Sequence, residues 1–462
     1  MTMDLKYVLE PKNVAVVGAS KDTSKLGHVI FRNFIESGFP GNVYPINPAN
    51  DVILNTKCYP SVLDVPGSID SAIIVVPAAH ATKVMQECAE KGIKGVVMIT
   101  SGFAEVGNVK GQEEVSKIAK DNDIALIGPN CLGVINPAAR VDSVFLPMYK
   151  LKRPKLGEIA FITQSGAVGS AVVDLAADMG IGMSKFISYG NAAVVNETHL
   201  LEYLATDKKT KVIAAYIETT KEGRRFIDVA KEVTKEKPII LIKAGKTAGG
   251  TRAAASHTAS MAGSAEVYSA AFKQARIIEV QSLTDLFDYS KIFMQPPPKG
   301  PKVAILTNGG GAGVLTADEI EKAGLKLADF SKETKEDLRS KLPSYVNIGN
   351  PLDLAGDADT ARYKAAMDLL MVDEGIDAII VILLFQTISL ESSVNQIILS
   401  AAQQNRKPII ALSIGGQFTS MNKQILESNG VPTYSSPEVA VGALSKLAWY
   451  YRCISQGECG PL

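Results

Sequence analysis

The sequence predicts an α/β protein with three doubly wound parallel-sheet domains, because one local design occurs three times along the chain. In each instance an apolar run of strand type leads into a turn of small residues, and a helical pattern follows. The instances cover residues 13–27, 157–180 and 302–324. Each opens a region of alternating strand and helix patterns, which is typical of parallel sheets covered by helices on both faces. The length of 462 residues agrees with about three domains.

The first region, residues 1–145, contains four further short runs of buried-strand type with amphipathic helical stretches between them. The strand patterns are NVYPINP, SAIIVVP, GVVMITSG and IALIGPN, and ATKVMQECAEKG is one of the helical stretches. We therefore predict a Rossmann-like domain.

The second region, residues 146–294, begins after a stretch rich in Pro and Lys. Its strand patterns are GEIAFITQSG, MSKFISYGN, VIAAYIETT and KPIILIKAG. The next eight residues, QPPPKGPK at 295–302, hold four prolines, which remove backbone donors and fix φ, so we predict a linker there. The third region, residues 303–462, runs through GIDAIIVILLFQ and KPIIALSIGG to a helix that begins near Pro437.

The composition argues against several classes of protein. The chain has 48 basic and 48 acidic side chains, so its formal charge gives no general attraction to nucleic acid or to an anionic membrane. The five cysteines are scattered and form no C-x-x-C pair, which favours neither disulfides nor a metal site. The sequence shows no secretion signal and no long apolar segment of membrane-spanning type. We expect a cytoplasmic protein.

The turn after the first strand, Gly18-Ala19-Ser20, is a candidate phosphate site. Unpaired backbone N–H groups and the helix dipole favour an anion at such a turn. The turn lacks a full G-x-G-x-x-G pattern, and the next strand ends in Asn47 where a nicotinamide site requires an acidic residue. This disfavours NAD and is compatible with a ribose that carries a phosphate, as in coenzyme A. A Rossmann-like scaffold with an empty turn is the alternative.

The second and third turns resemble each other, since each places an amide and small residues at the start of a helix. They are Gln164-Ser165-Gly166-Ala167 and the stretch from Asn308 to Gly313. Two such helix ends that converge would hold a phosphate between them, but close packing of helix on strand also explains the small residues. The string AGKT at 244–247 is not a P-loop, because Ile240 stands where the motif requires glycine.

His257 lies in a segment of very small side chains. Of the 21 residues from Ala244 to Ser264, 17 are Gly, Ala, Ser or Thr. Such a segment buries little apolar surface, so its packing energy is small and we expect it to move. Because neutral imidazole is nucleophilic near pH 7, we predict that His257 carries a group between sites. The other histidines are candidates for packing or capping: His28, His80 and His199.

The motifs, taken in order, resemble the nucleoside-diphosphate-forming acyl-CoA synthetases, in particular the α subunits of the ADP-forming acetyl-CoA synthetases and more distantly that of succinyl-CoA synthetase. The resemblance covers nearly the whole chain. It rests on GASKDTSKLG, VYPINP, VVPAAH, ITSGFAEVG, GPNCLGVINP, FITQSGAVG, ISYGN, YIET, SHTASMAGS, TNGGGAGVLTADEIEKAG and GNPLDLAGDAD. It implies a Rossmann-like first domain and two flavodoxin-like domains of succinyl-CoA-synthetase type.

The resemblance also implies a reaction sequence. Phosphate cleaves acyl-CoA to acyl phosphate and CoA, His257 takes the phosphoryl group, and the phosphohistidine passes it to ADP. Glu218, at the end of the VIAAYIETT strand, is implied as the carboxylate that orients the histidine, and an ordinary surface or helix-terminal carboxylate is the alternative. A non-catalytic scaffold that senses CoA or acyl-CoA is the alternative for the whole chain.

In this family the nucleotide binds an ATP-grasp module, and none of the 462 residues resembles one. The resemblance therefore implies a separate ATP-grasp β subunit in an α₂β₂ heterotetramer. That subunit would bind ADP or ATP with Mg, while this chain would use CoA, acetyl-CoA and phosphate as substrates and hold no tightly bound cofactor and no metal. The segment SHTASMAGS differs from that of succinyl-CoA synthetase, which favours a small monocarboxylate over a dicarboxylate.

The resemblance implies two sets of binding residues. The expected CoA site consists of Gly18, Ser20, Lys25, Gly27, Asn47, Val76, Pro77 and Gly102. The expected site for acyl phosphate or phosphohistidine consists of Ser165, Gly166, Gly310, Gly311 and Ala312.

Overall fold

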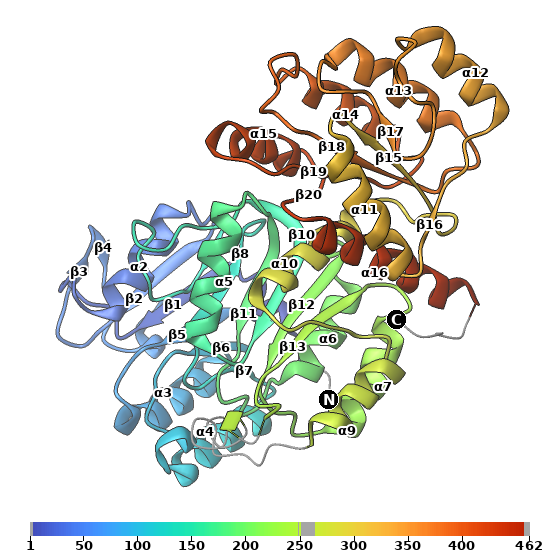
Figure 1. Ribbon diagram of the computed structural model, residues 1–462. Helices are drawn as coiled ribbons and strands as arrows, with labels where there is room; N and C mark the ends of the chain where they lie inside the picture. Colours follow the sequence, from blue (N-terminus) through green and yellow to red (C-terminus); the bar gives the residue numbers. More distant parts are fainter. Residues whose placement is uncertain (1–2, 248, 251–263, 457–462) are drawn as a thin grey trace. The chain divides into compact units, whose positions relative to one another are not determined.

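The computed structural model describes residues 3–247, 249–250 and 264–456, and His257 lies outside them (Figure 1). The chain divides into two compact units, Met1–Leu283 and Thr284–Leu462. The first unit contains two large sheets and the small antiparallel hairpin of β3 (Val52–Ile53) and β4 (Thr56–Lys57). The second unit contains one sheet.

The first sheet is parallel and has the strand order β2-β1-β5-β6-β7. Its strands are β1 (Asn13–Val17), β2 (Asn42–Ile46), β5 (Ser71–Ile74), β6 (Gly95–Met98) and β7 (Ala125–Ile127). The accompanying helices are α1 (Lys6–Leu9), α2 (Leu26–Glu36), η1 (Val62–Asp64), α3 (Ala78–Lys91), η2 (Ala104–Val106) and α4 (Val109–Asp121). Every residue of β5, β6 and β7 is buried, which explains why these strands lack polar alternation.

The second sheet has the order β14-β13-β12-β10-β11-β8-β9. Its parallel strands are β10 (Leu156–Thr163), β11 (Met183–Ser188), β12 (Val212–Ile217), β13 (Ile239–Lys243) and β14 (Ile278–Glu279). The helices are α5 (Gly166–Asp178), α6 (Glu197–Thr206), α7 (Gly223–Val233) and α9 (Ala265–Gln274).

Two antiparallel strands extend the second sheet: β8 (Gly133–Asn136) pairs with β11, and β9 (Val141–Asp142) pairs with β8. Both strands lie within residues 1–145, the predicted first region, and the predicted domain boundaries stay predictions.

The third sheet is parallel, with the order β16-β15-β18-β19-β20 and with β17 paired to β15. Its strands are β15 (Lys302–Thr307), β16 (Lys326–Leu327), β17 (Leu352–Asp353), β18 (Ala378–Ile382), β19 (Ile409–Leu412) and β20 (Thr433–Tyr434). The helices are α10 (Leu283–Lys291), which begins at the boundary between the units, η3 (Ile292–Met294), α11 (Gly310–Lys322), α12 (Lys332–Lys341), α13 (Thr360–Val372), α14 (Val394–Gln403), α15 (Gln417–Ser428) and α16 (Pro437–Gln456).

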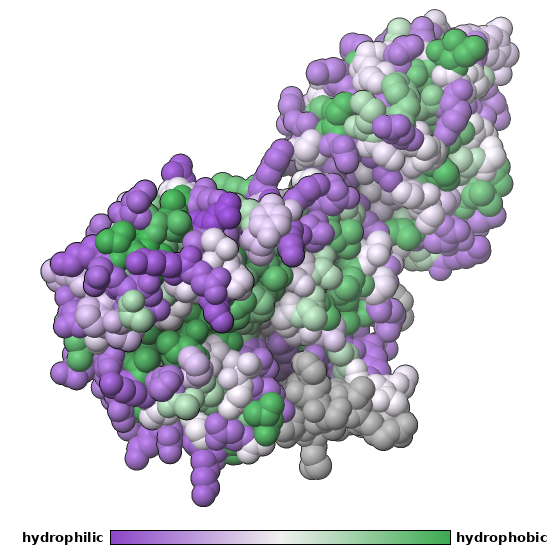
Figure 2. Space-filling model, turned by 90° about the vertical axis from the view of Figure 1, so that its left-hand side faces the viewer, coloured by the Kyte–Doolittle hydropathy of each residue, from purple (hydrophilic) through white to green (hydrophobic). Residues whose placement is uncertain are grey.

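Apolar cores lie between the sheets and the helices that cover them, in the first unit and in the second. The face shown in Figure 2 carries many hydrophilic residues with hydrophobic ones between them. Within the described residues, no helix combines the length and apolar character that a bilayer crossing requires. The predicted fold class, an α/β chain with three mainly parallel doubly wound sheets, is confirmed.

One expectation about the cysteines is wrong. Cys453, near the end of α16, is disulfide-bonded, whereas Cys58, Cys88 and Cys131 are buried free thiols.

The three sheets share one feature that positions the candidate sites. In each, the chain runs from a central strand (β1, β10 or β15) to a neighbour on one side and then crosses to a strand on the other side. Ligands of open α/β sheets bind at such a switch point, in the crevice at the carboxyl ends of the strands. All three small-residue turns follow these central strands.

Candidate functional site

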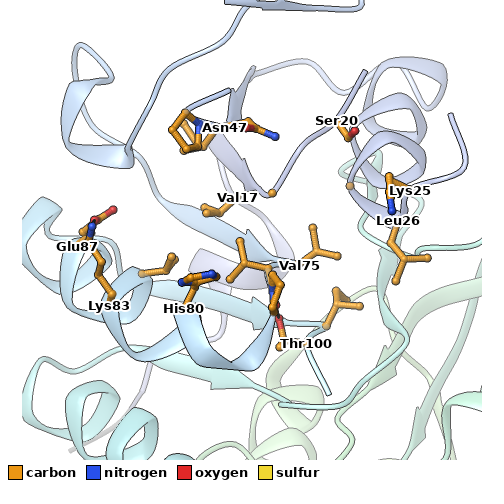
Figure 3. A pocket seen from close by; sticks show the side chains of 18 of the residues that line it. Val17, Ser20, Lys25, Leu26, Asn47, Val75, His80, Lys83, Glu87 and Thr100 are labelled. Atoms are coloured by element: carbon orange, nitrogen blue, oxygen red, sulfur yellow. Dashed lines mark hydrogen bonds and ion pairs between the residues drawn. The ribbon is translucent and has the colours of Figure 1, made fainter. Parts of the chain in front are cut away.

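A cavity of about 740 Å³ lies at the switch point of the first sheet (Figure 3). The carboxyl ends of β1, β2, β5 and β6, the first turn of α2 and one face of α3 form its wall. The residues that line it are Val17, Gly18, Ser20, Lys25, Leu26, Gly27, Ile46, Asn47, Pro48, Pro60, Val75, Val76, Pro77, His80, Lys83, Val84, Glu87, Ile99, Thr100 and Ser101.

The cavity brings together most of the residues predicted for a CoA site. Those that line it are Gly18, Ser20, Lys25, Gly27, Asn47, Val76 and Pro77. The remaining one, Gly102, follows the lining residue Ser101 and has a φ of +104°. Their role in binding CoA stays a prediction.

Two glycines allow the backbone to pack closely at this turn. Gly18 has a φ of +94°, and a Cβ atom there would lie 2.9 Å from the carbonyl oxygen of Val75. A Cβ atom on Gly27, in the first turn of α2, would lie only 1.9 Å from the carbonyl oxygen of Gly18. The N-terminus of α2 therefore approaches the turn at a distance that only glycine permits.

The side chain of Asn47 joins the end of β2 to the turn after β1. Its Nδ2 donates to the carbonyl of Ala19 at 2.7 Å, and its Oδ1 accepts from the backbone of Ala49 at 2.9 Å. An amide with these two bonds replaces the carboxylate that would bind the hydroxyls of a nicotinamide ribose.

Three titratable side chains that line this cavity were not predicted for the CoA site: His80, Lys83 and Glu87. They follow one another along α3, as Figure 3 shows, and they line the cavity. Their i, i+3, i+7 spacing places them on one helix face, and this was the available signal. By contrast, His28 is buried with Nδ1 2.9 Å from the carbonyl of Ser20, and His199 takes part in the N-terminal cap of α6.

The second turn lies at the carboxyl end of β10. Ser165 caps α5 by accepting a hydrogen bond from the backbone of Val168 at 3.3 Å, and Gly166 begins the helix. The Oε1 of Gln164 accepts from the backbone N–H groups of Glu218 at 2.5 Å and Thr219 at 3.0 Å. This amide fixes the end of β12 beside the start of α5.

Glu218 follows β12 and is only 6% exposed, which argues against an ordinary surface carboxylate. The ammonium group of Lys243 donates to the backbone carbonyl of Glu218 at 2.6 Å and lies 4.5 Å from the centre of the Tyr268 ring. Burial lowers the pKa of Lys243, and the negative charge of Glu218 opposes that effect. A buried cation therefore lies close to Glu218.

The described ends of the small-residue segment lie beside Glu218. Lys243, the last residue of β13, pairs with Ile217 of β12, and the backbone of Ala244 donates to the Ile217 carbonyl at 2.9 Å. At the other end, the Tyr268 hydroxyl of α9 lies 3.1 Å from the Thr220 hydroxyl. Two described residues that precede and follow His257 in the chain, Ala244 and Tyr268, thus contact Ile217 and Thr220, on either side of Glu218.

The third turn repeats the construction of the second within the second unit. The Oδ1 of Asn308 accepts a hydrogen bond from the backbone N–H of Leu384, after β18, at 3.0 Å. In the second turn the side chain of Gln164 accepts in the same way from the residues after β12. Gly310 begins α11, and a Cβ atom there would lie 2.6 Å from a carboxylate oxygen of Asp353. No atom lies within 4 Å of a Cβ placed on Gly311, so this helix end, which also includes Ala312, is open there.

Two deeply buried polar residues near Glu218 were not predicted. Tyr189, directly after β11, is 0% exposed, and Glu197, the first residue of α6, is 1% exposed. Burial raises the pKa of Glu197 to about 7, and the nearby ammonium of Lys221 opposes this rise. Burial also raises the pKa of Tyr189 well above its usual value, and the negative charges of Glu197 and Glu218 add to this.

The pKa of Glu197 predicts a pH-dependent stability. Between pH 4.5, the ordinary value, and about 7 the folded chain keeps a proton that the unfolded chain has released, so the free energy of unfolding falls as pH rises. Glu197→Gln removes this ionisation. Its stability relative to wild type should therefore rise by up to about 3 kcal/mol across that window, as measured by urea unfolding. A difference in stability between Glu197→Gln and wild type that does not vary with pH would contradict the prediction.

Among the described residues, no group of three or more His, Cys, Asp or Glu side chains has an arrangement that would hold a metal ion.

Three family profiles match successive parts of the chain. A CoA binding domain matches residues 12–137, a succinyl-CoA ligase like flavodoxin domain matches 156–293, and a ligase-CoA domain matches 303–454.

Curated relatives are similar over nearly the whole chain. It is 43% identical to the ADP-forming acetate–CoA ligase II subunit alpha of Pyrococcus furiosus, over 99% of this chain and 100% of that one. It is also 43% identical to the ADP-forming acetate–CoA ligase of Methanocaldococcus jannaschii, but there it spans only 63% of the longer relative. Among solved structures, acetyl-coenzyme A synthetase 1 of Ca. Korarchaeum cryptofilum in complex with phosphate and ADP matches with a TM-score of 0.92, 38% identity and 98% coverage of both chains.

A CoA-binding domain followed by two domains of CoA-ligase type defines an acyl-CoA ligase of the succinyl-CoA ligase class. The chain belongs to the family of ADP-forming acetate–CoA ligases and corresponds in length to their alpha subunit. The resemblance inferred from the motifs is confirmed.

Proposed function

We propose that the chain is the α subunit of an ADP-forming acetate–CoA ligase, which converts acetyl-CoA, phosphate and ADP into acetate, CoA and ATP. The observation that carries this proposal is the arrangement at the carboxyl edge of the second sheet. Ser165 at the start of α5, buried Glu218 and both described ends of the His257 segment lie together there. The relatives named as acetate–CoA ligases support the choice of reaction.

The cavity in the first sheet binds CoA in this proposal. The Gly18–Ser20 turn and the N-terminus of α2 supply backbone N–H groups for a phosphate group, and Lys25 supplies a positive charge at the cavity wall. The apolar lining residues Val76 and Pro77 contact the uncharged parts of the ligand. The match of residues 12–137 to a CoA binding domain supports this assignment.

Two transfers follow. An oxygen of phosphate attacks the thioester carbonyl, the C–S bond breaks, and the CoA thiolate takes up a proton, which leaves acetyl phosphate. A ring nitrogen of His257 then attacks phosphorus, the bond between phosphorus and the acetate oxygen breaks, and acetate leaves. The N-terminus of α5, at Ser165 and Gly166, stabilises the phosphoryl oxygens, while Glu218 accepts a hydrogen bond from the other ring nitrogen and fixes the tautomer.

The phosphohistidine then gives its phosphoryl group to ADP. In this proposal the nucleotide and Mg bind to a separate ATP-grasp β subunit within an α₂β₂ assembly. The start of α11 forms a second helix end that faces a phosphate, and its residues are Gly310, Gly311 and Ala312. The subunit-alpha names of two relatives support a partner subunit, and the greater length of the M. jannaschii relative is compatible with a fused partner. The cytoplasmic location stays a prediction from the sequence.

The function is tested by assaying the chain co-expressed with an ATP-grasp partner. With acetyl-CoA, phosphate and ADP we expect ATP and free CoA to form in equal amounts, and no ATP when phosphate is omitted. The alternative, a scaffold that senses CoA, predicts CoA binding without phosphate-dependent cleavage of the thioester, and that result would overturn the proposal.

Glu218→Gln provides a more specific prediction. The amide keeps the size of the side chain but removes the carboxylate that accepts the ring N–H of His257. We expect formation of phosphohistidine to slow by about 100-fold, as for other partners that orient a histidine, while the KM for acetyl-CoA stays nearly constant. Glu232→Gln, an exposed carboxylate on α7, is the matched control and should keep wild-type activity. Full activity of Glu218→Gln would remove Glu218 from the mechanism.

A further inference from the structure

Tyr189 and Glu197 carry buried polar atoms that the proposed reaction does not yet use. The Tyr189 hydroxyl and the Oε1 of Glu197 have no hydrogen-bond partner among the residues that the structure describes. Both side chains are at least 99% buried. A buried polar atom without a hydrogen-bond partner destabilises the fold. A phenylalanine at position 189 would fill the same space without this hydroxyl group. The hydroxyl is therefore retained at a cost to stability, which indicates a role beyond packing.

The two residues lie at the same sheet edge as Glu218. Tyr189 follows β11 and Glu218 follows β12, and both strands pair with β10, whose end leads to Ser165. Tyr189 lies within electrostatic range of both Glu197 and Glu218. The negative charges of both carboxylates thus act on the phenol of Tyr189.

A cation and an anion, Lys221 and Glu222, act electrostatically on Glu197. The ammonium of Lys221 donates to the carbonyls of Asn191 at 3.1 Å and Ala192 at 3.0 Å, and its charge acts on Glu197. Glu222 adds a negative charge from the loop before α7. Burial is the main reason why Glu197 keeps its proton, and the negative charge of exposed Glu222 adds to this effect.

We propose that Tyr189 and Glu197 are positioning residues for Glu218, an inference that rests on the proposed function. The Tyr189 hydroxyl donates a hydrogen bond to the Glu218 carboxylate and holds it toward His257 during phosphoryl transfer. Below about pH 7 Glu197 keeps its proton, so it does not compete with Glu218 for the phenol. Glu218 then accepts the ring N–H of His257.

Tyr189→Phe separates this role from a structural one. We expect an equal or higher melting temperature, because the unpartnered hydroxyl is removed, together with a fall of about tenfold or more in the rate of phosphohistidine formation from acetyl-CoA and phosphate. The KM for acetyl-CoA should change by less than about twofold. The matched control is Tyr203→Phe on α6, whose hydroxyl is hydrogen-bonded to Glu10, and it should lower the melting temperature without slowing the reaction.

Glu197→Gln tests the protonation part of the proposal. The amide stays neutral at every pH, whereas wild-type Glu197 ionises as the pH passes about 7. The ratio of variant to wild-type rate should therefore rise by about threefold or more between about pH 6 and pH 8. A ratio that stays constant would overturn the role of Glu197.

The outcomes distinguish the two levels of the proposal. If the wild-type complex forms no phosphohistidine, the proposed function fails and the inference fails with it. If wild type is phosphorylated and Tyr189→Phe reacts at the same rate with the same pH profile, only the positioning role is overturned.

Discussion

Replacement of His257 by asparagine is expected to abolish ATP formation from acetyl-CoA, phosphate and ADP. Asparagine is polar and similar in size but has no nucleophilic ring nitrogen, so no phosphoryl group can be carried to the nucleotide. Loss of the nucleophile that carries the group between sites should lower turnover by at least about 10⁴-fold. The variant should still bind CoA normally, because the candidate CoA cavity is formed by the first sheet, whereas the described ends of the His257 segment belong to the second.

The control for this prediction is His199→Asn. His199 lies in the first turn of α6 with Nδ1 2.7 Å from the side-chain oxygen of Asn196, so it takes part in a helix cap. Its replacement should lower stability slightly and leave turnover unchanged. Turnover by His257→Asn above a few per cent of wild type would contradict the account.

Gly27→Ala is expected to cause the second large effect, a loss of CoA affinity of about 100-fold or more as measured by titration calorimetry. The added Cβ would lie 1.9 Å from the carbonyl oxygen of Gly18, which is backbone and cannot rotate away as a side chain can. Helix α2 must therefore move from the turn, and its N–H groups move with it.

Gly223→Ala is the matched control for Gly27→Ala. Gly223 is also in the first turn of a helix, but a Cβ there would meet the Thr220 hydroxyl at an ordinary 3.6 Å. This variant should fold and bind CoA as wild type does, with helix stability raised by about 0.5–1 kcal/mol. Unchanged CoA affinity of folded Gly27→Ala would show that the turn does not bind the ligand.

Much of the fold could be predicted because the strand patterns, the turns and the helix patterns that follow one another in the sequence all indicate the same architecture. The strand patterns around Val17, Thr163 and Thr307 are each followed by small residues and an apolar helix, and a parallel doubly wound sheet satisfies all three features. The glycine turns were predicted for the same reason, since Gly18 adopts a positive φ that few other residues tolerate.

The remaining features depend on contacts between distant segments. The pairing of β8 and β9 with the second sheet joins Ile135 to Phe186, and no local pattern specifies that partner. Glu197 looks in the sequence like an acidic residue in the first turn of an exposed helix. Its burial to 1% exposure follows from the packing of α6 against β10 and β12, and no pattern within α6 specifies these partners.

The central claim is that His257 carries the phosphoryl group, and the most direct measurement is to locate that group. The wild-type complex is incubated with ³²P-labelled phosphate and acetyl-CoA without nucleotide, and the labelled chain is digested and sequenced by mass spectrometry. The account predicts an acid-labile phosphate on His257 that disappears when ADP is added, with labelled ATP formed in its place. Release of CoA and acetyl phosphate with no label on the chain, or with label on another residue, would contradict it.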